Sequence, residues 1–250
     1  MADKRNSHII PRFLNKRLFD VVEYRHTMEI DNKGKERKIQ NTPAEDYILC
    51  SLCEKRFEII ETYFARRFDD LNQFVHHPDK FKLFKIEKAL FLESNFKPNL
   101  FLLFVYSLIW RTSISSHKAF LNFKLPQEIE ENIRIILDTD LGGNHKEMLN
   151  KTSRTHEIAK PIVCIIRALE YSDETRGLLC AYSLNKNDYI LFTTEFLIFI
   201  YTDSRSAPLS HKNFSIDGLS KVIIPLAPTN EWNDIRSNIF RKFNVQQHGT

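Results

Sequence analysis

The sequence has few of the residues that build flexible linkers, and no segment suited to cross a membrane. It contains only 6 glycines and 9 prolines in 250 residues, which argues against long flexible linkers. The most apolar run, Leu100–Trp110, is too short for a bilayer, which takes about 20 residues. The N-terminal MADKRNSHII has no long apolar region and so is unlike a signal peptide. The expected location is therefore cytoplasmic, without a membrane partner.

Charge of either sign is not strongly in excess. The formal net charge is +4, with 42% hydrophobic and 27% charged residues, as in a soluble globular protein with a sizeable core. A positive excess this small is compatible with a phosphate-rich partner but does not demonstrate one. The 20 phenylalanines are expected to fill the core.

Cysteine is also scarce, with four residues in the chain. In a cytoplasmic protein they are expected to be reduced thiols or metal ligands. Cys164 and Cys180 lie in strand-like runs and are predicted to be core thiols. Cys50 and Cys53 have the C-x-x-C spacing and could supply two of the four ligands of a structural zinc. The alternative is that they are two buried, incidental thiols.

The N-terminal third combines short extended pieces with one amphipathic helix. Residues 20–30 alternate as a strand does, and a hairpin partner is expected around residues 37–40. From Cys53 to Val75 the apolar residues recur at helical steps and predict one buried stripe: Phe57, Ile60, Phe64, Phe68 and Leu71. The helix is expected to end near HHPDK, because Pro78 disfavours helical geometry at the residue before it.

The rest of the chain predicts helices first and strands afterwards. Residues 79–118 are expected to form two helices broken near NFKPN, and PQEIEENIRIILD a third. From Pro161, runs such as PIVCIIRAL and KVIIPLA predict strands, followed by the amphipathic helix NEWNDIRSNIFRKF. We therefore predict an α+β fold in three parts: residues 1–78, a helical region at 79–158, and a β-rich region at 159–250. The last part could also bind a protein partner or a second copy of the chain.

Two motifs point to chemistry. SHIIP, Ser7–Pro11, is followed after a hairpin-sized gap by LCSLCEKRF, Leu49–Phe57, which opens the predicted helix. This order resembles the HNH nuclease superfamily, whose fold is two strands and a helix (ββα) around a metal. Within it the chain is most similar to bacterial proteins with SHIIP followed by LLCxxCExxFSxxE. The nuclease-like resemblance covers roughly residues 7–75, and SLIWRTSIS, Ser107–Ser115, also resembles a stretch of those proteins.

The resemblance implies an HNH-like ββα module in residues 1–78 and a metal-dependent endonuclease, which suggests bacterial defence. His8 would be the general base that takes a proton from water, and Glu54 its catalytic partner. Mg²⁺ or Mn²⁺ would be held by acidic side chains, namely Glu54 with Glu45 and Asp46. Cys50 and Cys53 would bind a structural Zn²⁺.

Basic residues near these motifs are candidates for contact with a nucleic-acid backbone, DNA rather than RNA. The set is Arg12, Lys16, Arg17, Arg66 and Arg67, with Lys35, Arg37 and Lys38 nearby. Scattered solubilising charge would explain them equally well. Glu58 and Glu61 could join Glu54 in an acidic cluster, or could pair with Lys55 and Arg66 on a solvated surface. Arg111 is expected to be an ion-paired residue near a helix end.

Three departures from the superfamily pattern keep other functions open. Ser7 stands where an acidic residue is common, Glu54 where His or Asn is usual, and no C-x-x-C precedes the HIIP segment. His26, Cys164 or Cys180 could complete a zinc site only through tertiary contacts. A non-catalytic nucleic-acid-binding or regulatory protein with a degenerate HNH fold is the first alternative. An interaction protein, in which His8 ends a strand and the cysteines are buried, is the second.

Overall fold

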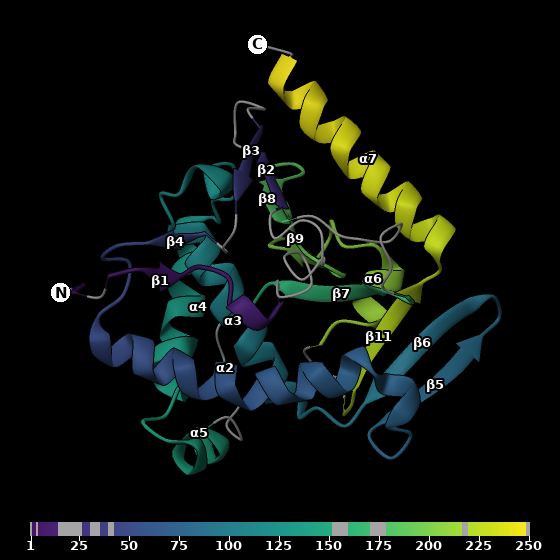
Figure 1. Cartoon of the computed structure of the whole chain (residues 1–250), viewed down its shortest axis with the longest axis horizontal. Coiled ribbons are helices and arrows are strands. Elements are labelled where there is room, and N and C mark those ends of the chain that lie inside the picture. Colours follow the sequence, from purple (N-terminus) through teal and green to yellow (C-terminus); the bar gives the residue numbers. More distant parts are fainter. Residues whose placement is uncertain are drawn as a thin grey trace.

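The structure is a computed structural model that describes residues 2–3, 5–14, 27–30, 36–39, 43–151, 160–170, 179–216 and 220–248. The described residues form one seven-stranded sheet, two small two-stranded sheets, and helices on both faces of the large sheet (Figure 1). The predicted α+β class is therefore confirmed. None of the described helices is both long and apolar enough to cross a membrane.

The large sheet draws strands from distant parts of the chain. Neighbouring strands are antiparallel, except that β11 and β7 run parallel. The order across the sheet is β5 (Phe81–Ile86), β6 (Ala89–Ser94), β11 (Val222–Ala227), β7 (Ile162–Ala168), β10 (Phe196–Tyr201), β9 (Asp188–Thr193) and β8 (Leu179–Ser183). The boundary expected near residue 158 thus falls within one continuous sheet.

Both faces of the sheet are covered at β7, β9 and β10, which explains why these strands are apolar almost throughout, whereas most side chains of the edge strand β5 are exposed. Side chains alternate along β9, so that Leu191 belongs to the larger core cluster and Phe192 to the smaller one. On the smaller side, Trp232 and Ile239 of α7 (Thr229–His248) pack on the sheet. The larger cluster joins the other face to the middle helices. The strands and final helix predicted after Pro161 are confirmed.

Two helices occupy most of the larger core. α2 (Ser51–Asn72) buries the whole predicted stripe from Phe57 to Leu71. It ends before Pro78, and a short 3₁₀ turn, Phe74–His76, separates the two. α3 (Pro98–Ile114) is buried nearly all round, which makes it the central helix. Other helices among the described residues are η2 (Lys118–Phe120), α4 (Gln127–Asp140), α5 (His145–Lys151) and α6 (Leu209–Asn213).

The N-terminal part contributes two short strand pairs. β2 (Thr27–Ile30) pairs with β3 (Glu36–Ile39), as the predicted hairpin requires, whereas residues 20–26 lie outside the described residues. β1 (Ser7–His8) pairs with β4 (Ala44–Glu45) in antiparallel register. This second pair places the SHIIP motif beside the residues that lead into α2 (Figure 1).

The helix predicted over the first part of residues 79–118 is wrong, because β5 and β6 form a hairpin there. The helical region expected at 79–158 thus begins with two strands. FKLFKI has apolar residues at 81, 83, 84 and 86, which does not follow the strict two-residue alternation of a strand. The turn residues Glu87 and Lys88 include neither Gly nor Asn, the usual hairpin signals, although Glu87 has a φ of 52°. The sequence therefore lacked the turn residues that distinguish a hairpin from a helix.

Phe64 is the central side chain of the α2 stripe. It is fully buried, with ring centroids 4.9 Å from Phe104 and 5.6 Å from Phe101. We expect Phe64→Ala to lower the free energy of unfolding by about 3–5 kcal/mol, because it leaves a cavity. Leu209→Ala, at a side chain that is 72% exposed, should change it by less than about 0.5 kcal/mol. Urea unfolding measures both, and equal stability of the two variants would contradict this packing.

Candidate functional site

His8 is held at both its backbone and its ring. Its carbonyl oxygen accepts a hydrogen bond from Nη1 of Arg111 at 2.9 Å, and its Nε2 accepts one from Nε of Arg12 at 2.9 Å. Burial of the imidazole, with the positive charges of Arg12 and Arg111, lowers the pKa of His8 below its usual 6.5. The ring is therefore mainly neutral at pH 7, as a general base must be.

Arg111 is the residue that ties this strand to the helices. Its side chain is 2% exposed and forms an ion pair with Oε1 of Glu61 on α2 at 2.7 Å. Its Nε donates to the carbonyl of Ser107, one turn earlier in α3, at 3.1 Å. One guanidinium thus joins β1, α2 and α3. The expected ion pair at Arg111 is confirmed, and it corrects the surface pairing of Glu61 with Lys55 or Arg66 that was one of the alternatives.

The face of α2 near Arg111 is acidic. Burial raises the pKa of Glu61, Arg111 lowers it, and the negative charges of Glu54 and Glu58 raise it further, so that the net shift is upward. The three carboxylates are therefore close enough to interact. Oε2 of Glu54 is buried and has no hydrogen-bond partner among the described residues. Such an oxygen is costly unless a donor or cation meets it, so Glu54 fits a hard divalent metal.

Glu45 and Asp46 have other partners. Glu45 accepts hydrogen bonds from Oγ of Ser115 at 2.8 Å and from the N–H of Ser116 at 3.0 Å, which ties β4 to the end of α3. Burial raises the pKa of Glu45, but hydrogen bonds from Ser116 and Ser115 outweigh it and lower the pKa. Asp46 accepts from the N–H of Asn6 at 2.7 Å. No group of three or more His, Cys, Asp or Glu side chains able to hold a metal occurs in the described part of the chain.

The C-x-x-C pair lies at the start of α2. Sγ of Cys50 and Sγ of Cys53 are 2.9 Å apart, and neither is in a disulfide. Two thiolates on one tetrahedral Zn²⁺ would be about 3.8 Å apart, given Zn–S bonds of about 2.3 Å. The pair as it stands does not fit a zinc knuckle. Cys164 and Cys180 lie in β7 and β8, where burial raises the pKa of each thiol to about 12, in keeping with core thiols.

The predicted basic residues differ in their contacts and in their exposure to solvent. Arg12 is bonded to His8, and Arg67 stacks on Tyr63 with its guanidinium 3.5 Å from the ring centroid. Arg66 is exposed on α2. Lys16 and Arg17 lie outside the described residues, as do His26 and Lys35. Only Arg12 is thus brought to His8 in the described structure.

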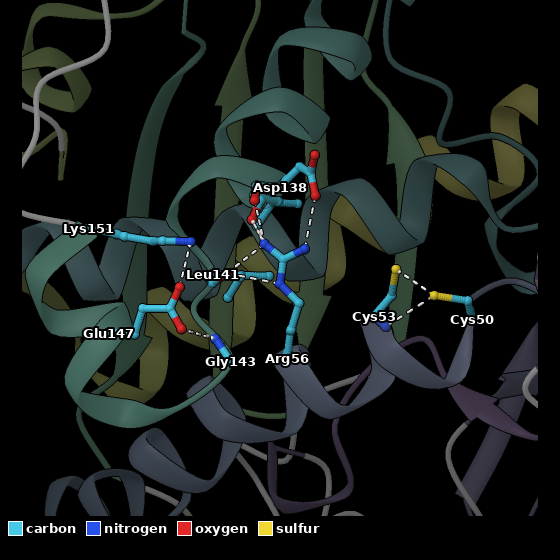
Figure 2. A network of polar contacts seen from close by, with 9 residues as sticks. Cys50, Cys53, Arg56, Asp138, Leu141, Gly143, Glu147 and Lys151 are labelled. Carbon is cyan, nitrogen blue, oxygen red and sulfur yellow. Dashed lines mark hydrogen bonds and ion pairs between the residues drawn. The ribbon is translucent and has the colours of Figure 1, made fainter.

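Sequence reasoning predicted an ion pair at Arg111 but missed that Arg111, Ser115 and Ser116 hold His8 and Glu45 in position. The signal for Arg111 and Ser115 was that SLIWRTSIS resembles a stretch of the same bacterial proteins, whereas Ser116 lies one residue beyond that stretch. Arg56 was also missed. It reaches the end of α4, donating to Asp138 Oδ1 and to the carbonyl of Leu141, both at 2.9 Å (Figure 2). This guanidinium meets the negative end of the α4 dipole and anchors the first turns of α2.

Arg111 and Glu61 allow a direct test of this anchoring. We expect Arg111→Met to lower the free energy of unfolding by about 3–5 kcal/mol, because it leaves Glu61 without its charge partner. Adding Glu61→Gln should recover at least about 2 kcal/mol of that loss by removing the stranded charge.

The exposed pair of Arg134 with Glu131 is the matched control, and Arg134→Met should cost less than about 1 kcal/mol. Chemical denaturation of all four proteins measures the differences. A double variant no more stable than Arg111→Met would show that the guanidinium acts by packing and not by charge.

Comparisons with known proteins leave the family open. No family model matches the chain, and neither a curated protein nor a solved structure matches it. The resemblance of SHIIP and LCSLCEKRF to the HNH superfamily therefore stays a prediction.

Proposed function

We propose that the protein is a metal-dependent, HNH-like endonuclease that hydrolyses phosphodiester bonds in nucleic acid. The observation that carries this proposal is the shared guanidinium of Arg111, which bonds to the His8 carbonyl and to Glu61. This nitrogen joins the backbone of His8 to Glu61, which interacts with Glu54 and Glu58 on an acidic face of α2. On that face the carboxylate of Glu54 has a buried oxygen without a hydrogen-bond partner among the described residues.

His8 is the proposed general base. At neutral pH its unprotonated ring can take a proton from a water molecule as that water attacks phosphorus. Nε2 of His8 accepts a hydrogen bond from Arg12, so Arg12 must release it first. An arriving phosphate offers the Arg12 guanidinium a stronger, anionic acceptor, which would free the imidazole when substrate is present.

Glu54 is the proposed metal ligand. A bound Mg²⁺ or Mn²⁺ would stabilise the charge that develops on the phosphate and on the leaving oxygen. Other residues of the site hold its strands and helices in position. Glu45 holds β4 against α3 through Ser115 and Ser116, so that β1 and its His8 keep their register.

The proposed substrate is DNA, bound through its backbone. Arg12 beside the base and the exposed Arg66 would contact phosphates and carry no sequence information by themselves. A role in bacterial defence rests on the family resemblance alone, since none of these contacts distinguishes foreign DNA from the cell's own.

Removal of the His8 ring tests the proposal. We expect wild type with Mg²⁺ or Mn²⁺ to nick supercoiled plasmid, and His8→Ala to do so about 10²–10⁴-fold more slowly, because the general base is lost. His76→Ala is the matched control, at an exposed histidine just beyond the other end of α2, and should keep wild-type activity. Gel analysis of nicked plasmid over time measures the rates. Equal rates for wild type and His8→Ala would overturn the assignment.

The pH dependence of the nicking rate should reflect the protonation of the His8 ring. Nicking should rise with pH as His8 loses its proton, with a midpoint below 6.5, and level off by about pH 7. Arg12→Gln should shift this midpoint upward, because it removes a positive charge that lowers the pKa of His8. Initial nicking rates in overlapping buffers measure both profiles. An unchanged midpoint in Arg12→Gln would contradict the assignment of the acidic limb to His8.

A non-catalytic nucleic-acid-binding protein is the second candidate. The bonds that occupy Glu45, and the lack of a three-ligand group in the described part of the chain, favour it over a working metal centre. Fluorescence anisotropy with a labelled DNA duplex separates the two candidates. Binding that weakens with salt, without nicking at any metal concentration, would support the second. An interaction protein would show neither.

A further inference from the structure

The start of α2 holds two thiols in an arrangement that the proposed nuclease does not use. Cys50 is the N-cap residue, with an extended backbone, and its Sγ accepts a hydrogen bond from the N–H of Cys53 at 3.2 Å. The two sulfur atoms are 2.9 Å apart. Figure 2 shows the two side chains facing each other at the start of α2. A disulfide has an S–S length of about 2.05 Å, so the sulfurs need to approach each other by less than about 1 Å to bond.

The environments of the two thiols differ in the way that a reactive pair requires. Cys50 lies at the N-terminus of α2, where its Sγ accepts a hydrogen bond from the N–H of Cys53 and where the positive end of the helix dipole favours a thiolate. Cys53 lies within the first turn of the helix and lines a cavity. Cys50 is therefore the thiol that attacks, and Cys53 is the thiol that follows.

The surroundings leave room for the exchange. Cys53 lines a cavity of about 230 Å³ whose other walls include the apolar side chains of Leu49, Phe57 and Trp110. Arg56, three residues after Cys53, fixes this part of α2 to the end of α4. The sulfur of Cys53 can thus move toward Cys50 while the helix stays in place.

We propose that Cys50 and Cys53 form a redox-active dithiol that is oxidised by external disulfides. The thiolate of Cys50 attacks one sulfur of the disulfide RSSR, whose S–S bond breaks and releases RS⁻, which takes a proton from water. Cys53 then gives its proton to water and attacks Sγ of Cys50, releasing the second RSH. The two protein thiols are oxidised to one disulfide, and RSSR is reduced to two RSH.

This inference is independent of the proposed nuclease, since neither thiol acts in that chemistry. It rests on the 2.9 Å distance between the two sulfur atoms, which is too short for two thiolates bound to one Zn²⁺. Zinc binding by Cys50 and Cys53 is therefore the competing outcome that the experiment has to distinguish.

The test uses the full chain and glutathione as the probe. Reduced protein is equilibrated at pH 7 with rising ratios of oxidised to reduced glutathione. The reaction is quenched with acid, the remaining thiols are alkylated, and the intact mass is measured by mass spectrometry. We expect Cys50 and Cys53 to become protected together, without added glutathione mass, while Cys164 and Cys180 remain alkylated after unfolding. Cys180→Ala is the control variant and should form the same disulfide.

Two single variants assign the roles. Cys53→Ser should accumulate one glutathione on Cys50, because the resolving thiol is gone. Cys50→Ser keeps a good N-cap acceptor, so α2 should still form, but Cys53 should react at least about 10-fold more slowly. Circular dichroism checks that both variants fold.

Either of two results would overturn the proposal. The first is the absence of an intramolecular disulfide at every glutathione ratio. The second is one zinc per chain in metal analysis of the wild type, lost from both serine variants and shielding the two thiols from oxidation. That result would show that Cys50 and Cys53 bind a structural zinc ion.

Discussion

The arrangement of the candidate site depends on one buried guanidinium. Arg111 extends from the central helix α3 and meets a carboxylate of α2 and the backbone of β1 with the same nitrogen. A buried guanidinium is costly unless its charge is paired, so the contacts of Nη1 with Glu61 and His8 tie α2 and β1 to α3, although Nη2 has no hydrogen-bond partner among the described residues. β1 has only two residues and could not hold its place by strand pairing alone. The position of His8 therefore follows from the need to pair this charge.

The sheet provides the rigid support behind these contacts. Its central strands, covered on both faces, give α2 and α3 a wide apolar surface to pack on. A second buried ion pair, Arg167 with Glu195 at 3.0 Å, joins β7 to the β9–β10 turn. Thr194 in that turn donates a hydrogen bond to the carbonyl of Leu14 at 2.8 Å. The N-terminal segment is thus bound to the sheet as well as to the helices, although its own strands are very short.

The first turns of α2 carry two kinds of chemistry side by side. Cys50 and Cys53 face each other at the helix start, whereas Glu54 belongs to the acidic face near Arg111. Arg56 holds the same segment to α4. A helix N-terminus favours anions, whether thiolate or carboxylate, because its N–H groups are unpaired and its dipole is positive there. The helix N-terminus therefore suits both the Sγ of Cys50, which accepts the N–H of Cys53, and the acidic side chain of Glu54.

The sequence by itself determined the elements whose pattern is strong: the stripe of α2, the long apolar run of α3, and the strands after Pro161. It also singled out His8, Glu54 and the two cysteines through their motifs. Only the tertiary structure decided the β5–β6 hairpin, whose turn lacks Gly and Asn, and the partners of the charged residues. Arg111 and Glu61 are far apart along the chain, and so are Glu45 and the serines after α3. Spacing along a chain reports which face a residue occupies, but charge pairing across elements depends on how the helices and strands pack together.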